Sequence, residues 1–188
     1  MYLEKLELSG FRSFEKAGIP LCKDLTLFVG ENNGGKSNAI DAIRLLTAPL
    51  SGRREIYSEP TDIRFGSAAR SFEISATFTE LSAGQKGRLI TAANDSQISG
   101  CSFGLRYEEV AQRIPGRSST WAGQHKGVAE LGAHEMVRHV YLPALRDAKR
   151  ALASGSSTRI YALLKHFLGD ISQDDLVANL RRTQNVPD

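Results

Sequence analysis

The stretch Gly30-Glu31-Asn32-Asn33-Gly34-Gly35-Lys36-Ser37 decides the fold of this chain, because it reads G-x-x-x-x-G-K-S, the pattern of a phosphate-binding P-loop. The run Leu25–Val29 before it is short, apolar and β-prone, and predicts a buried strand. The helix predicted after it has its apolar stripe at Ile40, Ile43 and Leu45 or Leu46. Strand, glycine-rich loop and helix in this order indicate an α/β nucleotide-binding fold.

The residue types in this loop predict how it binds phosphate. Glycines leave room for the backbone to turn tightly around an anion, and the helix N-terminus then points its N–H groups at the phosphates. Lys36 is predicted to reach the β and γ oxygens, and Ser37 to ligate Mg²⁺, so the expected cofactors are ATP and Mg²⁺. The alternative is a chance match in a glycine-rich loop. The predicted binding set is Gly30, Asn32, Asn33, Gly34, Gly35, Lys36, Ser37 and Asn38.

Three pieces of the chain resemble the N-terminal ATPase region of the overcoming-lysogenization-defect (OLD) family of ATP-dependent nucleases, which is related to the RecF and SMC branch of ABC ATPases. The segment Gly10-Phe11-Arg12-Ser13-Phe14 is shared broadly with RecF and SMC proteins. The doubled asparagine Asn32-Asn33 and the run Tyr141-Leu142-Pro143-Ala144-Leu145-Arg146-Asp147-Ala148 are similar to the OLD group.

The resemblance implies a P-loop ATPase lobe of the ABC/SMC type, with a mixed sheet around the nucleotide. It implies Arg12 near the nucleotide base, although the alternative is a plain surface arginine. It also implies a dimer that sandwiches the nucleotide, a C-terminal DNA-cutting domain in the full-length protein, and a role in phage defence.

Composition sets wider bounds. The 188 residues are 41% hydrophobic and 24% charged, which is ordinary for a globular protein. Two cysteines and no signal peptide predict a reducing cytoplasm, and no apolar run is long enough to cross a membrane. A net charge of +3 permits nucleic-acid binding without indicating it.

The rest of the chain predicts further strands and a helical tail. Apolar alternation predicts strands at Tyr2–Leu8, Phe72–Phe78 and Gly100–Glu108, and Val137–Leu142 reads as a strand ended by Pro143. An irregular second strand is expected over 11–20, a long loop over 47–70, and a loop or hairpin over 114–128. We expect an ATPase lobe over residues 1–145 and a helical appendage over 146–188.

The segment Leu81-Ser82-Ala83-Gly84-Gln85-Lys86 looks like the ABC signature L-S-G-G-Q, but a strand ending in Asp-Glu does not follow it. Ser82 with Gln85 three residues later instead predicts a capping box that starts a helix.

Several parts of a complete ATPase are missing from the sequence. No apolar run ends in Asp-Glu, Asp147 is a poor Walker B carboxylate, and Arg146 is read either as a phosphate or DNA ligand or as an ion-pair partner. The four histidines lack metal-ligand spacing, and no Toprim-like acidic cluster is visible. We therefore expect the chain to bind ATP without turning it over, as the first part of a longer protein. The alternatives are a RecF- or SMC-type repair ATPase without nuclease, and a non-enzymatic nucleotide-gated dimerisation module.

Overall fold

The computed structural model describes residues 1–50, 54–110, 113–130 and 132–142. The chain divides into two compact units, Met1–His139 and Val140–Asp188. All the helices and strands described below belong to the first unit. The predicted boundary at 145/146 and the predicted helical appendage lie outside the described residues.

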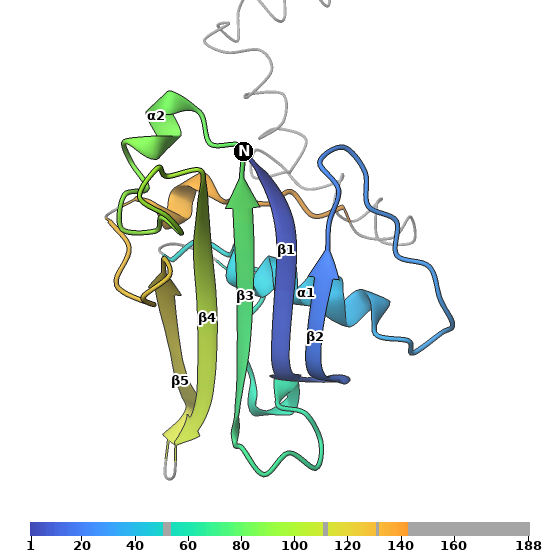
Figure 1. Ribbon diagram of the computed structural model, residues 1–188. Helices are drawn as coiled ribbons and strands as arrows, with labels where there is room; N and C mark the ends of the chain where they lie inside the picture. Colours follow the sequence, from blue (N-terminus) through green and yellow to red (C-terminus); the bar gives the residue numbers. More distant parts are fainter. Residues whose placement is uncertain (51–53, 111–112, 131, 143–188) are drawn as a thin grey trace, which may run out of the picture. The chain divides into compact units, whose positions relative to one another are not determined.

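A five-stranded sheet forms the centre of the first unit, with strand order β2-β1-β3-β4-β5 (Figure 1). Every neighbouring pair is antiparallel, so successive strands are joined as hairpins or by loops that return to the same sheet. The strands are β1 (Tyr2–Phe11), β2 (Phe14–Pro20), β3 (Ser71–Thr79), β4 (Gly100–Val110) and β5 (Arg113–Ala122). The predicted strands at Tyr2–Leu8, Phe72–Phe78 and Gly100–Glu108 are confirmed. The segment 114–128, predicted as a loop or hairpin, includes most of β5, which pairs with β4.

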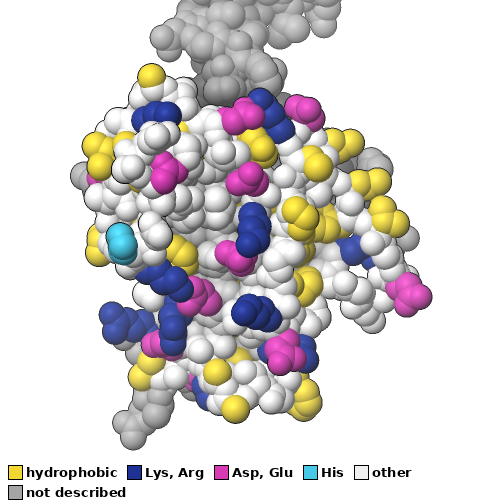
Figure 2. All heavy atoms as spheres, in the orientation of Figure 1, with side chains coloured by type: hydrophobic (Ala, Val, Ile, Leu, Met, Phe, Trp, Pro, Cys, Tyr) yellow, Lys and Arg dark blue, Asp and Glu magenta, His cyan; other side chains and the backbone are white. Residues whose placement is uncertain are grey.

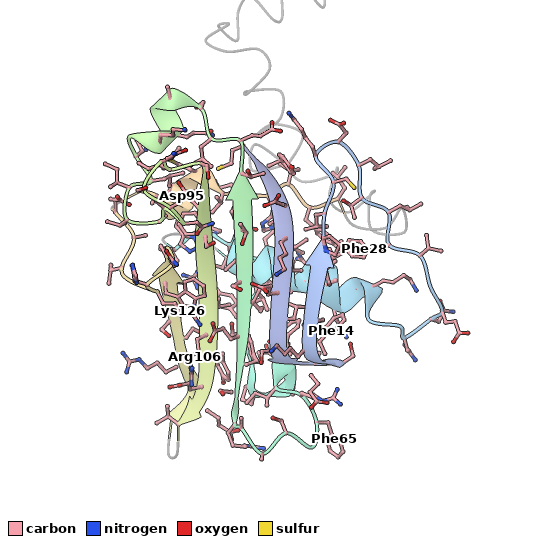
Figure 3. The ribbon with its side chains drawn as sticks, viewed as in Figure 1. Phe14, Phe28, Phe65, Asp95, Arg106 and Lys126 are labelled. Carbon is pink, nitrogen blue, oxygen red and sulfur yellow. The ribbon has the colours of Figure 1, made fainter. Side chains whose placement is uncertain are left out.

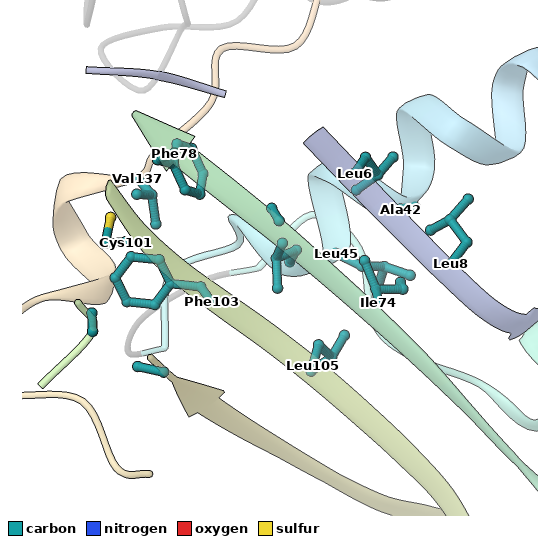
Figure 4. Close-up of a cluster of buried hydrophobic side chains, with 14 of the residues drawn as sticks. Leu6, Leu8, Ala42, Leu45, Ile74, Phe78, Cys101, Phe103, Leu105 and Val137 are labelled. Atoms are coloured by element: carbon teal, nitrogen blue, oxygen red, sulfur yellow. The ribbon is translucent and has the colours of Figure 1, made fainter. Parts of the chain in front are cut away.

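Helix α1 (Lys36–Leu46) covers one face of this sheet and closes the core (Figures 1 and 4). Strand β3 alternates half-buried and buried residues along its whole length, because every second side chain points toward the helix. The helix buries Ala39, Ala42, Leu45 and Leu46, whereas Ile40 and Ile43 of the predicted stripe are only half-buried. Small residues at the contact let the helix lie close to the strands.

Two predicted strands are wrong. Leu25–Val29 is assigned to no strand, and Leu25, Leu27 and Val29 are 76%, 77% and 83% exposed. Val137–Leu142 also forms no strand. An apolar run forms a strand only where a neighbouring strand completes its backbone hydrogen bonds. Neither segment pairs with another in the described part of the chain. All the strand pairs of the described sheet are antiparallel, whereas a mixed sheet was predicted.

The face of the sheet opposite α1 carries charges of both signs (Figure 2). Glu73 of β3 accepts from Lys126 at 2.5 Å and lies 3.8 Å from Arg106 of β4. Figure 3 shows Arg106 and Lys126 side by side on this face. Arg106 and Lys126 therefore share one carboxylate on this face.

Three short helices lie in the connections. They are the 3-10 helix η1 (Pro60–Asp62), α2 (Ala83–Lys86) and the 3-10 helix η2 (His134–Met136). At the start of α2, the Gln85 N–H donates to the Ser82 hydroxyl at 3.4 Å, and the Ser82 N–H donates to the Gln85 side chain at 2.9 Å. The predicted capping box is confirmed.

Candidate nucleotide-binding site

The P-loop motif runs into the first turn of α1, which begins at Lys36. Gly35 is the N-cap and makes no side-chain cap, and its carbonyl accepts the first helical hydrogen bond from Ala39 at 3.0 Å. The N–H groups of the helix's first turn consequently have no partner within the helix, and the positive end of its dipole faces the loop. Beside them lies a cavity of about 450 Å³ lined by Asn32, Asn33, Gly35, Lys36, Ser37 and Asn38. Six of the predicted binding residues therefore line one cavity, and Gly30 and Gly34 are not among its lining residues.

Lys36 folds back over its own loop. Its ammonium group donates to the Gly30 carbonyl at 2.8 Å and to the Glu31 carbonyl at 2.5 Å. Gly34 completes the turn by donating its N–H to the same Glu31 carbonyl at 3.1 Å. Backbone carbonyls are weaker partners for an ammonium than phosphate oxygens, so these bonds hold the lysine where an anion would capture it. Ser37 places an exposed hydroxyl at the same cavity.

The turn between β1 and β2 forms a wall against the loop. A Cβ on Gly35 would stand 2.9 Å from the Ser13 hydroxyl and 3.0 Å from Cζ of Phe14. Gly35 also has a φ of +85°, a conformation that other residues rarely adopt. Figure 3 shows Phe14 at the start of β2. The glycine is therefore required by its backbone and by its neighbours together.

Arg12 connects this turn to α1 and to η1. Its Nε donates to Asp62 at 2.8 Å, and its Nη1 donates to Asp41 at 2.7 Å and to Asn38 at 3.3 Å. The Asn38 amide in turn donates to the Ser13 hydroxyl at 2.9 Å. Sequence reasoning placed Arg12 near the nucleotide, and the structure places it one side chain away from the loop cavity.

Two carboxylates raise the pKa of Arg12. Partial burial lowers the pKa of Arg12, but the hydrogen bonds and charges of Asp41 and Asp62 together raise it by more than burial lowers it. The pKa of Arg12 therefore lies above its ordinary value. The guanidinium also borders a second cavity, of about 420 Å³, with Tyr57, Thr61 and Glu59 among its lining residues. Arg12 thus lies between the loop residues and this second cavity.

Sequence reasoning missed Asp41 and Asp62 as functional neighbours. Asp41 lies on the helix that follows the P-loop, one turn beyond Ser37, and this spacing was the available signal. Asp62 is 50 positions from Arg12, and nothing local in the sequence connects the two.

Other candidates lie elsewhere. The Leu81–Lys86 segment forms the capped start of α2, and Arg146, Asp147 and His166 fall outside the described residues. Within the described ranges, no group of three His, Cys, Asp or Glu side chains is placed to hold a metal ion. None of the helices described here combines the length and apolar character that a membrane crossing requires.

Comparisons with known proteins agree with this geometry. The sequence model of the AAA ATPase domain family matches residues 1–179. The Smc chromosome partition protein of Pyrococcus furiosus is 44% identical over 66 residues, which are 34% of this chain and 6% of that protein. The RecF replication and repair protein of Renibacterium salmoninarum is 42% identical over 66 residues, 35% of this chain and 16% of that protein. The matches therefore span only a small part of these relatives.

Solved structures show the same fold. A structure from work on ATP-driven dimerization and DNA-stimulated activation of SMC ATPases superposes with a TM-score of 0.56 at 26% identity, covering 88% of this chain and 98% of that one. A RecF–ATP structure gives a TM-score of 0.50 at 18% identity, covering 97% of this chain and 43% of that one. The fold is that of an α/β P-loop lobe of the ABC/SMC type.

Proposed function

We propose that this chain, which belongs to the AAA ATPase domain family, is the Mg-ATP-binding lobe of an ATPase that acts on DNA. One observation carries the proposal: Lys36, Ser37 and the uncapped start of α1 meet at a single cavity. A cation, a hydroxyl and a set of backbone N–H groups around one space match the charge and oxygen atoms of a triphosphate.

Each loop residue has a separate role in this proposal. Backbone N–H groups of the loop and the first helical turn bind the phosphate oxygens. Lys36 exchanges the Gly30 and Glu31 carbonyls for the β and γ oxygens, a change that replaces neutral acceptors by charged ones. The Ser37 hydroxyl is the side chain that would hold Mg²⁺, which supplies neutralisation of the phosphate charge when bound. Asn32, Asn33 and Asn38 complete the lining, with Arg12 beside it.

Hydrolysis requires groups that this cavity lacks. No acidic residue is among its described lining residues, and Asp41 is held by Arg12 and by Arg44, the latter at 2.8 Å. Phosphoryl transfer needs a carboxylate that holds the metal ion and a group that orients the attacking water. We propose that downstream segments and a second copy of the chain supply them. The likeness to an SMC ATPase from work on ATP-driven dimerization supports the dimer.

The activity of the whole protein is a further step of the proposal. The resemblance of the P-loop and Tyr141–Ala148 segments to the OLD family favours a coupled DNA endonuclease that acts in phage defence in the cytoplasm. The similarity to Smc and RecF proteins fits a DNA repair or chromosome ATPase without nuclease equally well. Incubating the full-length protein with DNA, ATP and Mg²⁺ separates the two, because only the first cuts DNA. A protein that dimerises with ATP and neither cuts DNA nor hydrolyses ATP would be a dimerisation module.

Isothermal titration with a non-hydrolysable ATP analogue and Mg²⁺ tests the central claim. Lys36→Ala should weaken binding at least about 100-fold, because a charge-assisted hydrogen bond contributes about 1.5–3 kcal/mol and Lys36 makes more than one. The melting temperature should not change, because Lys36 bonds only to exposed loop carbonyls. Affinity equal to that of the wild type in a folded Lys36→Ala protein would refute the proposal.

A further inference from the structure

Asp62 is a buried carboxylate anchored by the backbone. It is 4% exposed, and its Oδ2 accepts the Glu59 N–H at 2.9 Å in the capping box of η1. Its Oδ1 accepts from Arg12 Nε at 2.8 Å, and its backbone carbonyl accepts the Arg12 N–H at 2.8 Å. Asp62 therefore holds both the backbone and the side chain of Arg12.

Arg12 needs this support because of its backbone conformation. Its φ is +46°, in the left-handed region, which is unfavourable for a residue with a Cβ. Such conformations persist where surrounding contacts fix them, and they cluster at functional sites. The turn held in this conformation is the one whose Ser13 and Phe14 border Gly35.

Two neighbouring carboxylates offset the positive charge that the guanidinium presents to a ligand. Its Nε and Nη1 bond to two carboxylates and to the Asn38 amide. A cation between two carboxylates attracts a phosphate weakly, because the neighbouring negative charges offset its field. An influence of Arg12 on nucleotide binding therefore passes mainly through the shape of the turn.

We propose that Asp62 is a positioning residue for nucleotide binding, which fixes Arg12 and, through Arg12, the Ser13–Phe14 wall of the P-loop. The inference rests on the proposed ATP binding and adds a residue that does not touch the nucleotide. The wall borders the phosphate-binding part of the loop, so its displacement affects any ligand with a triphosphate, whatever base it carries.

Two ligands and four variants test this. Mg-ATP and inorganic tripolyphosphate are titrated into the full chain as wild type, Asp62→Asn, Arg12→Lys, the double variant, and Glu130→Gln. Asp62→Asn and Arg12→Lys should each weaken the binding of both ligands by about tenfold, because a displaced wall would misplace about one of the charged hydrogen bonds between the loop and the phosphates. The double variant should be no weaker than the worse single one, since the two residues act through one contact.

Glu130→Gln is the matched control. Glu130 accepts the Thr91 N–H at 2.6 Å in a loop pairing that does not involve the P-loop. Glu130→Gln should lower the melting temperature and leave the affinities for Mg-ATP and tripolyphosphate unchanged. This control separates an effect on the position of the P-loop wall from a general loss of stability. Arg12→Lys keeps the positive charge at a partly exposed position, so it remains informative if Asp62→Asn fails to fold.

Three results would overturn the inference. The first is affinity like that of the wild type in Arg12→Lys or in folded Asp62→Asn. The second is a loss for ATP without a loss for tripolyphosphate, which would make Arg12 a contact to the base or ribose. The third is wild-type protein that binds neither ligand, which would overturn the proposed function as well.

Discussion

Phe14 and Gly35 lie close together where the β1–β2 turn meets the P-loop: a Cβ on Gly35 would be 3.0 Å from Cζ of the Phe14 ring, so the ring would have to shift to admit it. The pair joins the first hairpin of the sheet to the nucleotide-binding loop. The conformation of the loop therefore depends on a residue that is not part of the motif.

Gly35→Ala should both destabilise the protein and weaken ATP binding. The left-handed backbone alone costs about 1–2 kcal/mol for a residue with a Cβ, and the contacts with Ser13 and Phe14 add to it. Thermal unfolding and titration with an ATP analogue measure the two effects. Gly84→Ala is the control, because a Cβ there meets nothing within 4 Å; within helix α2 it should keep or raise the stability and leave the affinity unchanged. An equal response of the two variants would contradict the contact.

Ser82→Ala should cost about 1 kcal/mol of stability, the usual value of an N-cap. The Ser82 hydroxyl accepts only the Gln85 N–H, and α2 lies outside the lining of the loop cavity. Denaturant unfolding of the chain gives the stability, and ATP turnover per folded molecule is measured in the full-length protein. A hundredfold loss of turnover with unchanged stability would show that Ser82 acts as a signature serine in a partner's site.

His134 should make the stability of the protein depend on pH. Burial lowers the pKa of His134 below its ordinary value of 6.5, with a smaller contribution from nearby Arg54. Among the described residues, neither ring nitrogen has a hydrogen-bond partner. The ring packs on Phe103 at a centroid distance of 5.1 Å. Because the unfolded state binds a proton more readily, the stability that neutral His134 provides is present above about pH 6.5 and is lost as the pH falls below it.

Melting temperatures between pH 8 and pH 5 check this prediction. His134→Leu should reduce the fall in melting temperature on acidification and keep or raise the value at pH 8, because it removes two unpartnered nitrogens from an apolar contact. His125→Gln, at an exposed position, should retain the wild-type slope. An unchanged slope in His134→Leu would assign the pH dependence to another group.

The isolated chain should bind ATP and release phosphate far more slowly than about 1 s⁻¹, the lower end of ordinary enzyme turnover. Loop contacts supply binding, but no carboxylate is among the described residues that line the cavity. Phosphate release from purified protein is the measurement, with Lys36→Ala as the control for contamination. Turnover near 1 s⁻¹ that disappears in that variant would show an unrecognised catalytic group, with Glu31, Asp41 and Asp147 as the first residues to substitute.

Sequence alone predicted the features that depend on neighbours along the chain. Spacing and local hydrogen bonds predict the P-loop motif, the helix that follows it, the alternation of β3 and the Ser82 capping box. The existence of strands β1, β3 and β4 was also predictable from the period of two in their apolar residues.

Tertiary structure decided what depends on distant residues. The apolar run Leu25–Val29 forms no strand although its composition is that of a strand, and Leu25, Leu27 and Val29 are exposed. Strand formation requires a partner that a local pattern does not specify. The sheet order pairs residues as distant as Tyr2 and Thr79. The contact of Asp62 with Arg12 joins residues 50 positions apart. The sequence by itself therefore determined that the chain has a phosphate-binding loop. Only the folded chain determined which residues fix its shape, since long-range packing and ion pairing leave no periodic signal.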